Sequence, residues 1–137
     1  MQELELIASS VPDTETRNCR RIEIGTAIHQ GDVYVDRVAD DWSRGDPIGS
    51  RQVAVGTNVG SRHIAEGDGV AVYAGKKLPD YMKPHADIEP GDLLGPVVVA
   101  TESWTLTHPE HAHHCLPAGT YQVTYQGDLL TRRRVVD

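Results

Sequence analysis

Apolar and polar residues alternate along most of this chain with a period of two, the period at which successive side chains of a β-strand change faces. No window of 12 residues keeps the 3.6-residue apolar stripe that is typical of a helix. The pattern therefore predicts an all-β protein. The expected strands lie within residues 21–24, 31–39, 51–56, 69–75, 95–102, 104–108 and 120–126, with a further short strand or frayed turn at 4–8.

Turn-forming residues separate these runs, as in Gly67-Asp68-Gly69 and Pro117-Ala118-Gly119. About eight short strands with such punctuation predict a small antiparallel β-barrel or sandwich with two long loops, at 40–50 and 76–92. The length of 137 residues fits a single β domain over 1–137, in which residues 1–18 are expected to form a loosely attached arm.

The charge balance argues against a nucleic-acid partner. Thirteen Lys and Arg residues against 20 Asp and Glu residues give a net charge of −7, whereas phosphate backbones are bound by clustered cations. The basic pair at 20–21 and the basic triplet at 132–134 are interpreted as solvated strand ends. Neither a secretory signal nor a membrane span is visible, so we expect a cytoplasmic protein with no membrane partner. Cys19 and Cys115 are then expected to be reduced thiols.

The segment from His108 to Cys115 has the densest candidate chemistry, because it contains four of the seven histidines and Glu110. If residues 111–115 are extended, His111 and His113 share one face of a strand. Pro109 lacks an N–H group, and a bend there would turn His108 toward His111. Glu110 lies within that bend, as a ligand, as a partner that orients an imidazole, or as the base of a catalytic site.

A complete site needs a donor from elsewhere in the chain, and His63, after a Gly-Ser turn, is the best candidate. We therefore predict a divalent transition metal (zinc, iron or nickel) at His63, His108, His111 and His113. Half-buried histidines that bond only to carbonyls or carboxylates are the structural alternative. Nucleotide-binding motifs and a nucleophile elbow are absent from the sequence, so no cofactor-binding residue is predicted.

Several stretches resemble a group of small uncharacterised bacterial proteins, some of them phage-associated. Those proteins have a "QGDV" element, a "VLAEGEVTGHAH"-like element and an "LTHPEHAPIELPAGTYRV"-like element. The corresponding pieces here are HQGDVYV (29–35), VAVGTNVGSRHIAEG (53–67), LTHPEHAHHCLPAGTYQVTYQ (106–126) and RRRVVD (132–137). The resemblance implies no activity. It favours His63, His108 and His111 as the core of any site with Glu110 close by, whereas Ser61 replaces one family histidine.

Three functions remain open at this level. The first is an oligomeric structural or assembly protein, in which Trp42, Tyr81 and Met82 would be interface residues and the histidines would hydrogen-bond between strands or subunits. The second is a metal-binding β-barrel, hydrolytic if Glu110 acts on a bound water. The third is a module that binds a ligand or partner. The sequence names no substrate and leaves open whether the protein is an enzyme.

Overall fold

The computed structural model describes residues 22–55, 62–79, 93–128 and 133–134, and these residues confirm the all-β prediction. Within these ranges all elements are strands and none is a helix, so no helix there is able to span a membrane. The strands are β1 (Ala27–Gln30), β2 (Val33–Val38), β3 (Arg44–Ile48), β4 (Gln52–Val55), β5 (Arg62–Glu66), β6 (Val70–Gly75), β7 (Leu94–Ala100), β8 (Trp104–Thr107), β9 (His114–Leu116), β10 (Gly119–Tyr125), β11 (Gly127–Asp128) and β12 (Arg133–Arg134).

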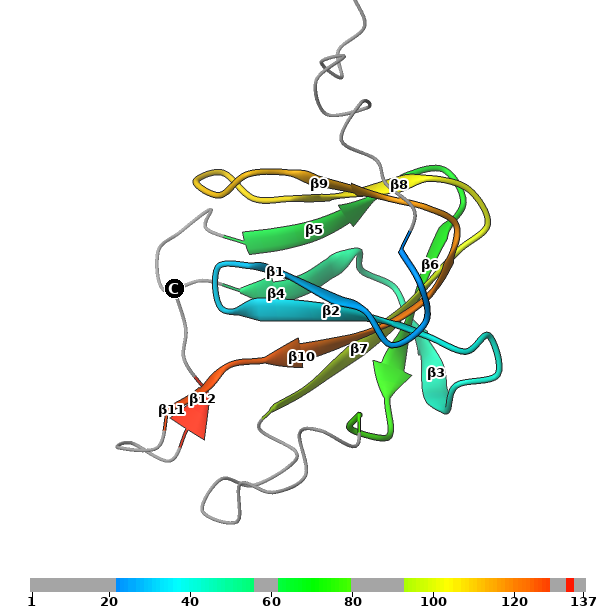
Figure 1. Cartoon of the computed structure of the whole chain (residues 1–137), viewed down its shortest axis with the longest axis horizontal. Coiled ribbons are helices and arrows are strands. Elements are labelled where there is room, and N and C mark those ends of the chain that lie inside the picture. The colour runs from blue at the N-terminus through cyan, green and yellow to red at the C-terminus, as the bar shows by residue number, and fades with distance from the viewer. Residues whose placement is uncertain (1–21, 56–61, 80–92, 129–132, 135–137) are drawn as a thin grey trace, which may run out of the picture.

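Two antiparallel sheets form the body of the protein (Figure 1). The six-stranded sheet has the order β1-β2-β10-β7-β6-β3, and the four-stranded sheet has the order β4-β5-β8-β9. Strands β11 and β12 form a separate two-stranded ribbon. The two sheets do not close on each other, so the fold is a sandwich rather than a barrel. Each sheet consequently has open edges.

The core lies between the sheets, where the alternating residues of the strands point inward. Val33 and Val35 of β2 are 0% and 1% exposed, and Leu106 of β8 is 0% exposed. Trp104 of β8 meets Tyr121 of β10 edge-on, with 5.3 Å between ring centroids. The sequence contains no Phe, so the centre of the core consists mainly of aliphatic residues together with this aromatic pair.

The segment 40–50 was predicted to be a loop, and this is wrong for its second half. Residues 44–48 form β3, which pairs with β6 at an edge of the larger sheet. The run Arg-Gly-Asp-Pro-Ile does not alternate, and it contains Pro47, which a sheet tolerates only at an edge. The register shifts between Arg44 and Pro47, as expected where a ladder is interrupted. An edge strand of this kind gives almost no periodic signal.

The predicted strand at 21–24 is also wrong over its described residues. Residues 24 and 25 form a turn, in which Gly25 has a φ of 94° and donates its N–H to the carbonyl of Arg37. Ile22 packs against the core, but Ile24 is 64% exposed. The two alternating isoleucines therefore do not mark a strand, because Ile22 packs against the core while Ile24 is exposed. The predictions on Cys19, Tyr81, Met82, the arm at 1–18 and most of 76–92 fall outside the described residues.

Candidate functional site

A fully buried imidazole stands between the two sheets. His63 is the second residue of β5, and strand alternation turns it inward beside Ala65, with both residues 0% exposed. Its Nδ1 lies 2.8 Å from Oε1 of Gln30, the last residue of β1 in the other sheet. The β1–β2 turn and the β8–β9 loop lie at the same end of the sandwich (Figure 1). Residues from three strand segments therefore meet around this ring.

The side-chain amide of Gln30 makes the Nδ1 of His63 a hydrogen-bond donor. Gln30 donates from Nε2 to the carbonyls of Leu106, at 3.0 Å, and Ala112, at 2.8 Å. Both contacts require the NH₂ group on that side, so the amide oxygen must point to the ring. The Nδ1 of His63 is then the donor, and the neutral ring carries its lone pair on Nε2.

That Nε2 faces a buried carboxylate. Asp32, in the β1–β2 turn, is 1% exposed, and its Oδ1 lies 3.6 Å from Nε2 of His63. A hydrogen bond between these atoms would be about 2.7–3.2 Å long. At this distance the two groups form an ion pair when the imidazole is protonated. The spacing is also close to the roughly 3.4 Å that separates two donor atoms bound to one tetrahedral zinc ion. The carboxylate and the imidazole thus have the spacing of two ligands.

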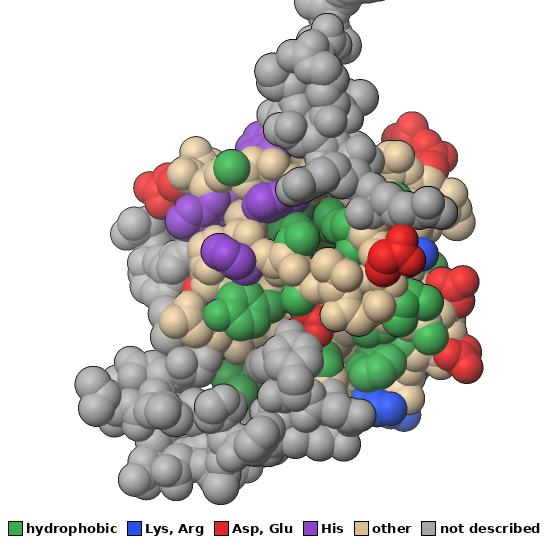
Figure 2. Space-filling view, viewed as in Figure 1, with side chains coloured by type: hydrophobic (Ala, Val, Ile, Leu, Met, Phe, Trp, Pro, Cys, Tyr) green, Lys and Arg blue, Asp and Glu red, His purple; other side chains and the backbone are tan. Residues whose placement is uncertain are grey.

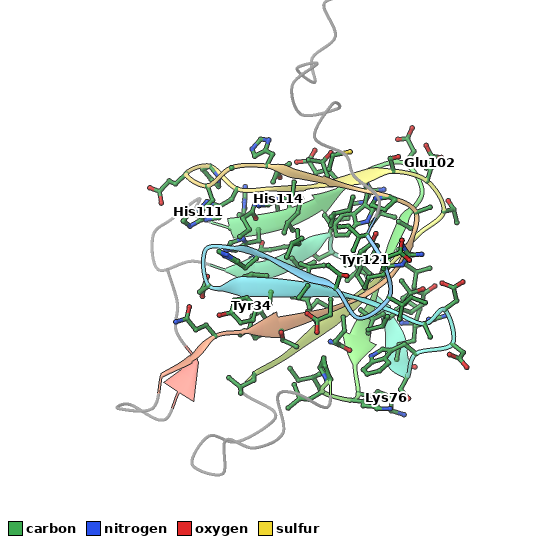
Figure 3. All side chains as sticks on the ribbon, viewed as in Figure 1. Tyr34, Lys76, Glu102, His111, His114 and Tyr121 are labelled. Atoms are coloured by element: carbon green, nitrogen blue, oxygen red, sulfur yellow. The ribbon has the colours of Figure 1, made fainter. Side chains whose placement is uncertain are left out.

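Two more imidazoles pack against His63, as the sequence predicted. The ring centroid of His108 lies 4.4 Å from that of His63 and 4.3 Å from that of His111. His63 and His111 are nearly parallel at 6.1 Å. The chain bends after β8 at Pro109, so the expected approach of His108 and His111 is confirmed. Histidine side chains gather on this part of the surface in Figure 2, and Figure 3 places His111 at the loop between β8 and β9.

His108 is held by its own loop. Its Nδ1 accepts the backbone N–H groups of Glu110, at 3.0 Å, and His111, at 3.2 Å. A ring that accepts at Nδ1 carries its proton on Nε2 when it is neutral. His63 and His108 are therefore opposite tautomers, and His108 is only 2% exposed. This arrangement makes the β8–β9 loop a compact turn around a buried ring.

A family model covers residues 29–126, which include His63, Gln30, Asp32, His108 and His111. The model is described as a domain of unknown function, DUF8820. The chain belongs to the DUF8820 family. No curated protein and no solved structure matches the chain. The expectation of an uncharacterised family is thus confirmed, while the specific shared motifs and the phage association stay predictions.

The remaining predicted residues of the DUF8820 domain stand apart from the buried centre. An H-x-H pair on one strand face required residues 111–113 to be extended, but the strand β9 begins only at His114. His113 is half-buried, and the side chain of Glu110 is exposed. His29 is exposed on β1, as expected. Among the residues with described positions, no three His, Cys, Asp or Glu side chains are already arranged to hold a metal ion.

The sequence analysis missed Gln30 and Asp32, which complete the polar centre of the DUF8820 domain. The piece HQGD led to no site prediction, because a Gly-Asp pair after an apolar strand is a common signal for a hairpin turn. Gly31 does occupy that turn, with a φ of 60°. Both polar residues that flank Gly31 lie within the residues that the family model covers.

Proposed function

We propose that this protein is a metal-binding β-sandwich whose centre is the pair formed by His63 Nε2 and the Asp32 carboxylate. The observation that carries the proposal is their 3.6 Å separation inside a fully buried site. Gln30 supports it, because a ligating histidine usually donates its other ring nitrogen to an oriented acceptor. Imidazole and carboxylate together suit zinc, iron or nickel rather than calcium or magnesium.

His111 is the third ligand in this proposal. Its ring lies 6.1 Å from that of His63, at the half-buried end of the cluster. Since no three donors converge in the described arrangement, the His111 side chain has to turn toward the ion on binding. His108 acts as a spacer between the two rings, because its Nδ1 is engaged by the loop backbone and its Nε2 then carries a proton. A three-residue site leaves a fourth position for water.

Metal content and affinity test the proposal on untagged protein. We expect about one equivalent of zinc, nickel or iron after reconstitution, measured by elemental analysis and by calorimetric titration. Asp32→Asn and His111→Asn should each weaken binding at least about tenfold, since each removes one donor. His29→Asn is the matched control, because this histidine is exposed and lies outside the cluster.

The alternative, in which the buried polar residues only join the two sheets, predicts the opposite result for metal binding. If the hydrogen bonds of Gln30 serve only to join the two sheets, wild-type protein will bind none of the three ions stoichiometrically. Asp32→Asn would then change the stability of the protein without any effect on metal retention. That result would sink the metal proposal. No hydrolytic role is assigned to Glu110, whose contact with the cluster is made by its backbone N–H.

A homo-oligomer is a second candidate, and exposed apolar side chains favour it. Ile48 is 41% exposed at the end of β3, an edge strand of the six-stranded sheet. Ile24 is 64% exposed just before β1, the opposite edge strand. In this proposal a second subunit covers such a side chain at the unpaired edge of a sheet. This proposal and the metal proposal are compatible, because they concern different parts of the sandwich.

A further inference from the structure

A pocket of about 440 Å³ opens at the other end of β2 from the histidine cluster. It is formed where the end of β2, the β2–β3 loop, the end of β7 and the turn before β10 come together. Asp32 and Arg37 are five residues apart along an extended segment, which places them about 16 Å apart at roughly 3.3 Å per residue. The pocket and the proposed metal site are therefore separate.

Two guanidinium groups line this pocket, from Arg37 and Arg44. Arg37 donates from Nη1 to the carbonyl of Ile22 at 2.9 Å, and Arg44 makes a long contact of 3.4 Å with the carbonyl of Asp40. Within the described ranges neither guanidinium forms an ion pair with a carboxylate. This is notable in a protein with seven more acidic than basic residues. The guanidiniums lie over the rings of Tyr121, at 5.6 Å, and Tyr73, at 5.1 Å, which leaves their charge in place. Arginines without a carboxylate partner in a concave site are the usual means of binding a carboxylate or phosphate.

The position of Arg37 depends on the neighbouring turn. Gly119 has a φ of 152°, a conformation that side-chain-bearing residues rarely adopt. A Cβ atom at Gly119 would come within 2.5 Å of the Arg37 Nε, so the guanidinium lies directly against the glycine. The buried Nε has no hydrogen-bond partner among the residues that the structure describes. The turn therefore positions the cation beside the pocket without neutralising it.

We propose that this pocket binds a small molecule through an oxyanion, held by Arg37 and Arg44. Val99 and Ala118 also line the pocket and offer an apolar surface to the remainder of such a molecule. The volume lies in the range of small-molecule sites. Among the described residues, Asp40 supplies the one carboxylate that lines the pocket, and it accepts a hydrogen bond from Thr120 Oγ1 at 3.4 Å. Two guanidiniums against one carboxylate leave a net positive charge at this site.

The test is an NMR titration of isotope-labelled, full-length protein with inorganic phosphate and, separately, with isovalerate. Chloride at equal ionic strength serves as the reference. We expect at least one of the two anions to give saturable shifts of the backbone amides of Gly119 and Thr120. Saturation by phosphate alone identifies a phosphate ligand, whereas saturation by isovalerate identifies a carboxylic acid with an apolar body. Arg44→Gln should raise the dissociation constant at least about tenfold, and Arg37→Gln should do the same.

Arg51→Gln is the matched control, because Arg51 is exposed and does not line the pocket. It should leave the dissociation constant unchanged. If neither anion saturates beyond the chloride reference, or if Arg44→Gln binds as tightly as the wild type, the proposal is wrong. Arg37→Gln removes the bond to Ile22, so its amide dispersion is checked first, and Arg44→Gln decides alone if that variant does not fold. None of these three arginine variants should change the metal affinity, because the proposed metal site lies at the other end of β2.

Discussion

Gln30 is the residue on which the buried centre depends most, because its single amide joins three parts of the protein. It accepts from His63 of β5 and donates to the carbonyls of Leu106 and Ala112 on either side of His108. Replacing it with alanine removes this partner from all three groups, and the contacts with His63 and with the carbonyl of Leu106 are buried. We predict that Gln30→Ala lowers the free energy of unfolding by about 2–4 kcal/mol.

Urea denaturation of metal-free protein measures this loss, with Gln126→Ala as the matched control. The side chain of Gln126 is exposed, so the control should stay within about 0.5 kcal/mol of the wild type. A Gln30→Ala protein as stable as the control would show that the amide bonds contribute nothing to the fold. In metal-loaded protein the same variant should bind roughly 10–100-fold more weakly, since Gln30 orients His63.

The histidine cluster also shows how far residue-level reasoning from the sequence extends. The bend at Pro109 was predicted from the missing N–H of proline, and His63 was predicted as the distant partner from its place after a turn and from the family resemblance. The three rings do approach one another. Asp32 and Gln30 were missed because a polar residue beside a hairpin glycine is explained equally well by the turn. Only the pairing of β1 with β2 and the packing of two sheets bring these side chains to His63, and neither can be read from local spacing.

At the level of elements, Trp42 fastens the β2–β3 loop to the larger sheet. Its indole N–H donates to Oε1 of Gln122 at 2.8 Å, and Gln122 is 0% exposed in β10. The amide nitrogen of Gln122 is occupied by the carbonyls of Gly95 and Val123. Trp42 therefore anchors the loop through a defined partner, whereas its role as an interface residue stays a prediction.

We predict that Trp42→Phe lowers the free energy of unfolding by about 1–2 kcal/mol, because a buried amide oxygen loses its donor. A double-mutant cycle with Gln122→Met isolates this interaction, and a coupling of about 1 kcal/mol is expected. Lys77 Nζ lies 4.6 Å from the indole centroid, and phenylalanine keeps an aromatic ring for that contact. Additive effects of the two substitutions would show that the loop is held by packing alone.

The strands themselves were predictable in proportion to their burial. Residues 33–38, 70–75 and 119–125 alternate or run apolar because each has a face in the core, and all three fall within the predicted ranges or within one residue of them. The edge strands β1, β3 and β9 were missed, since an edge strand is paired on one side and needs little apolar patterning. The inner strand β5 of the four-stranded sheet was missed as well. Pattern reasoning thus finds the centre of the six-stranded sheet more readily than its borders, but it did not find the strand that carries His63.

For the whole molecule, the open edges of the sandwich raise the question of what covers them. Pro47 has no N–H to offer, so β3 is poorly suited to adding a strand from another chain. Exposed Ile48 next to it is suited to side-chain packing against a second copy. We therefore place the proposed subunit contact at the β3 edge and assign it to apolar packing rather than to sheet extension.

Light scattering coupled to size-exclusion chromatography tests this contact. We predict a wild-type mass that is a multiple of the 15.0 kDa protomer. Ile48→Lys should shift the mass to that of one protomer, because a charge cannot be buried unpaired in an apolar contact. Thr26→Lys makes the same change of charge near β1, at the opposite edge, and should leave the assembly intact. A wild type that stays at 15.0 kDa at millimolar concentration rules out the oligomer. If Thr26→Lys dissociates the assembly and Ile48→Lys does not, the contact lies at the β1 edge.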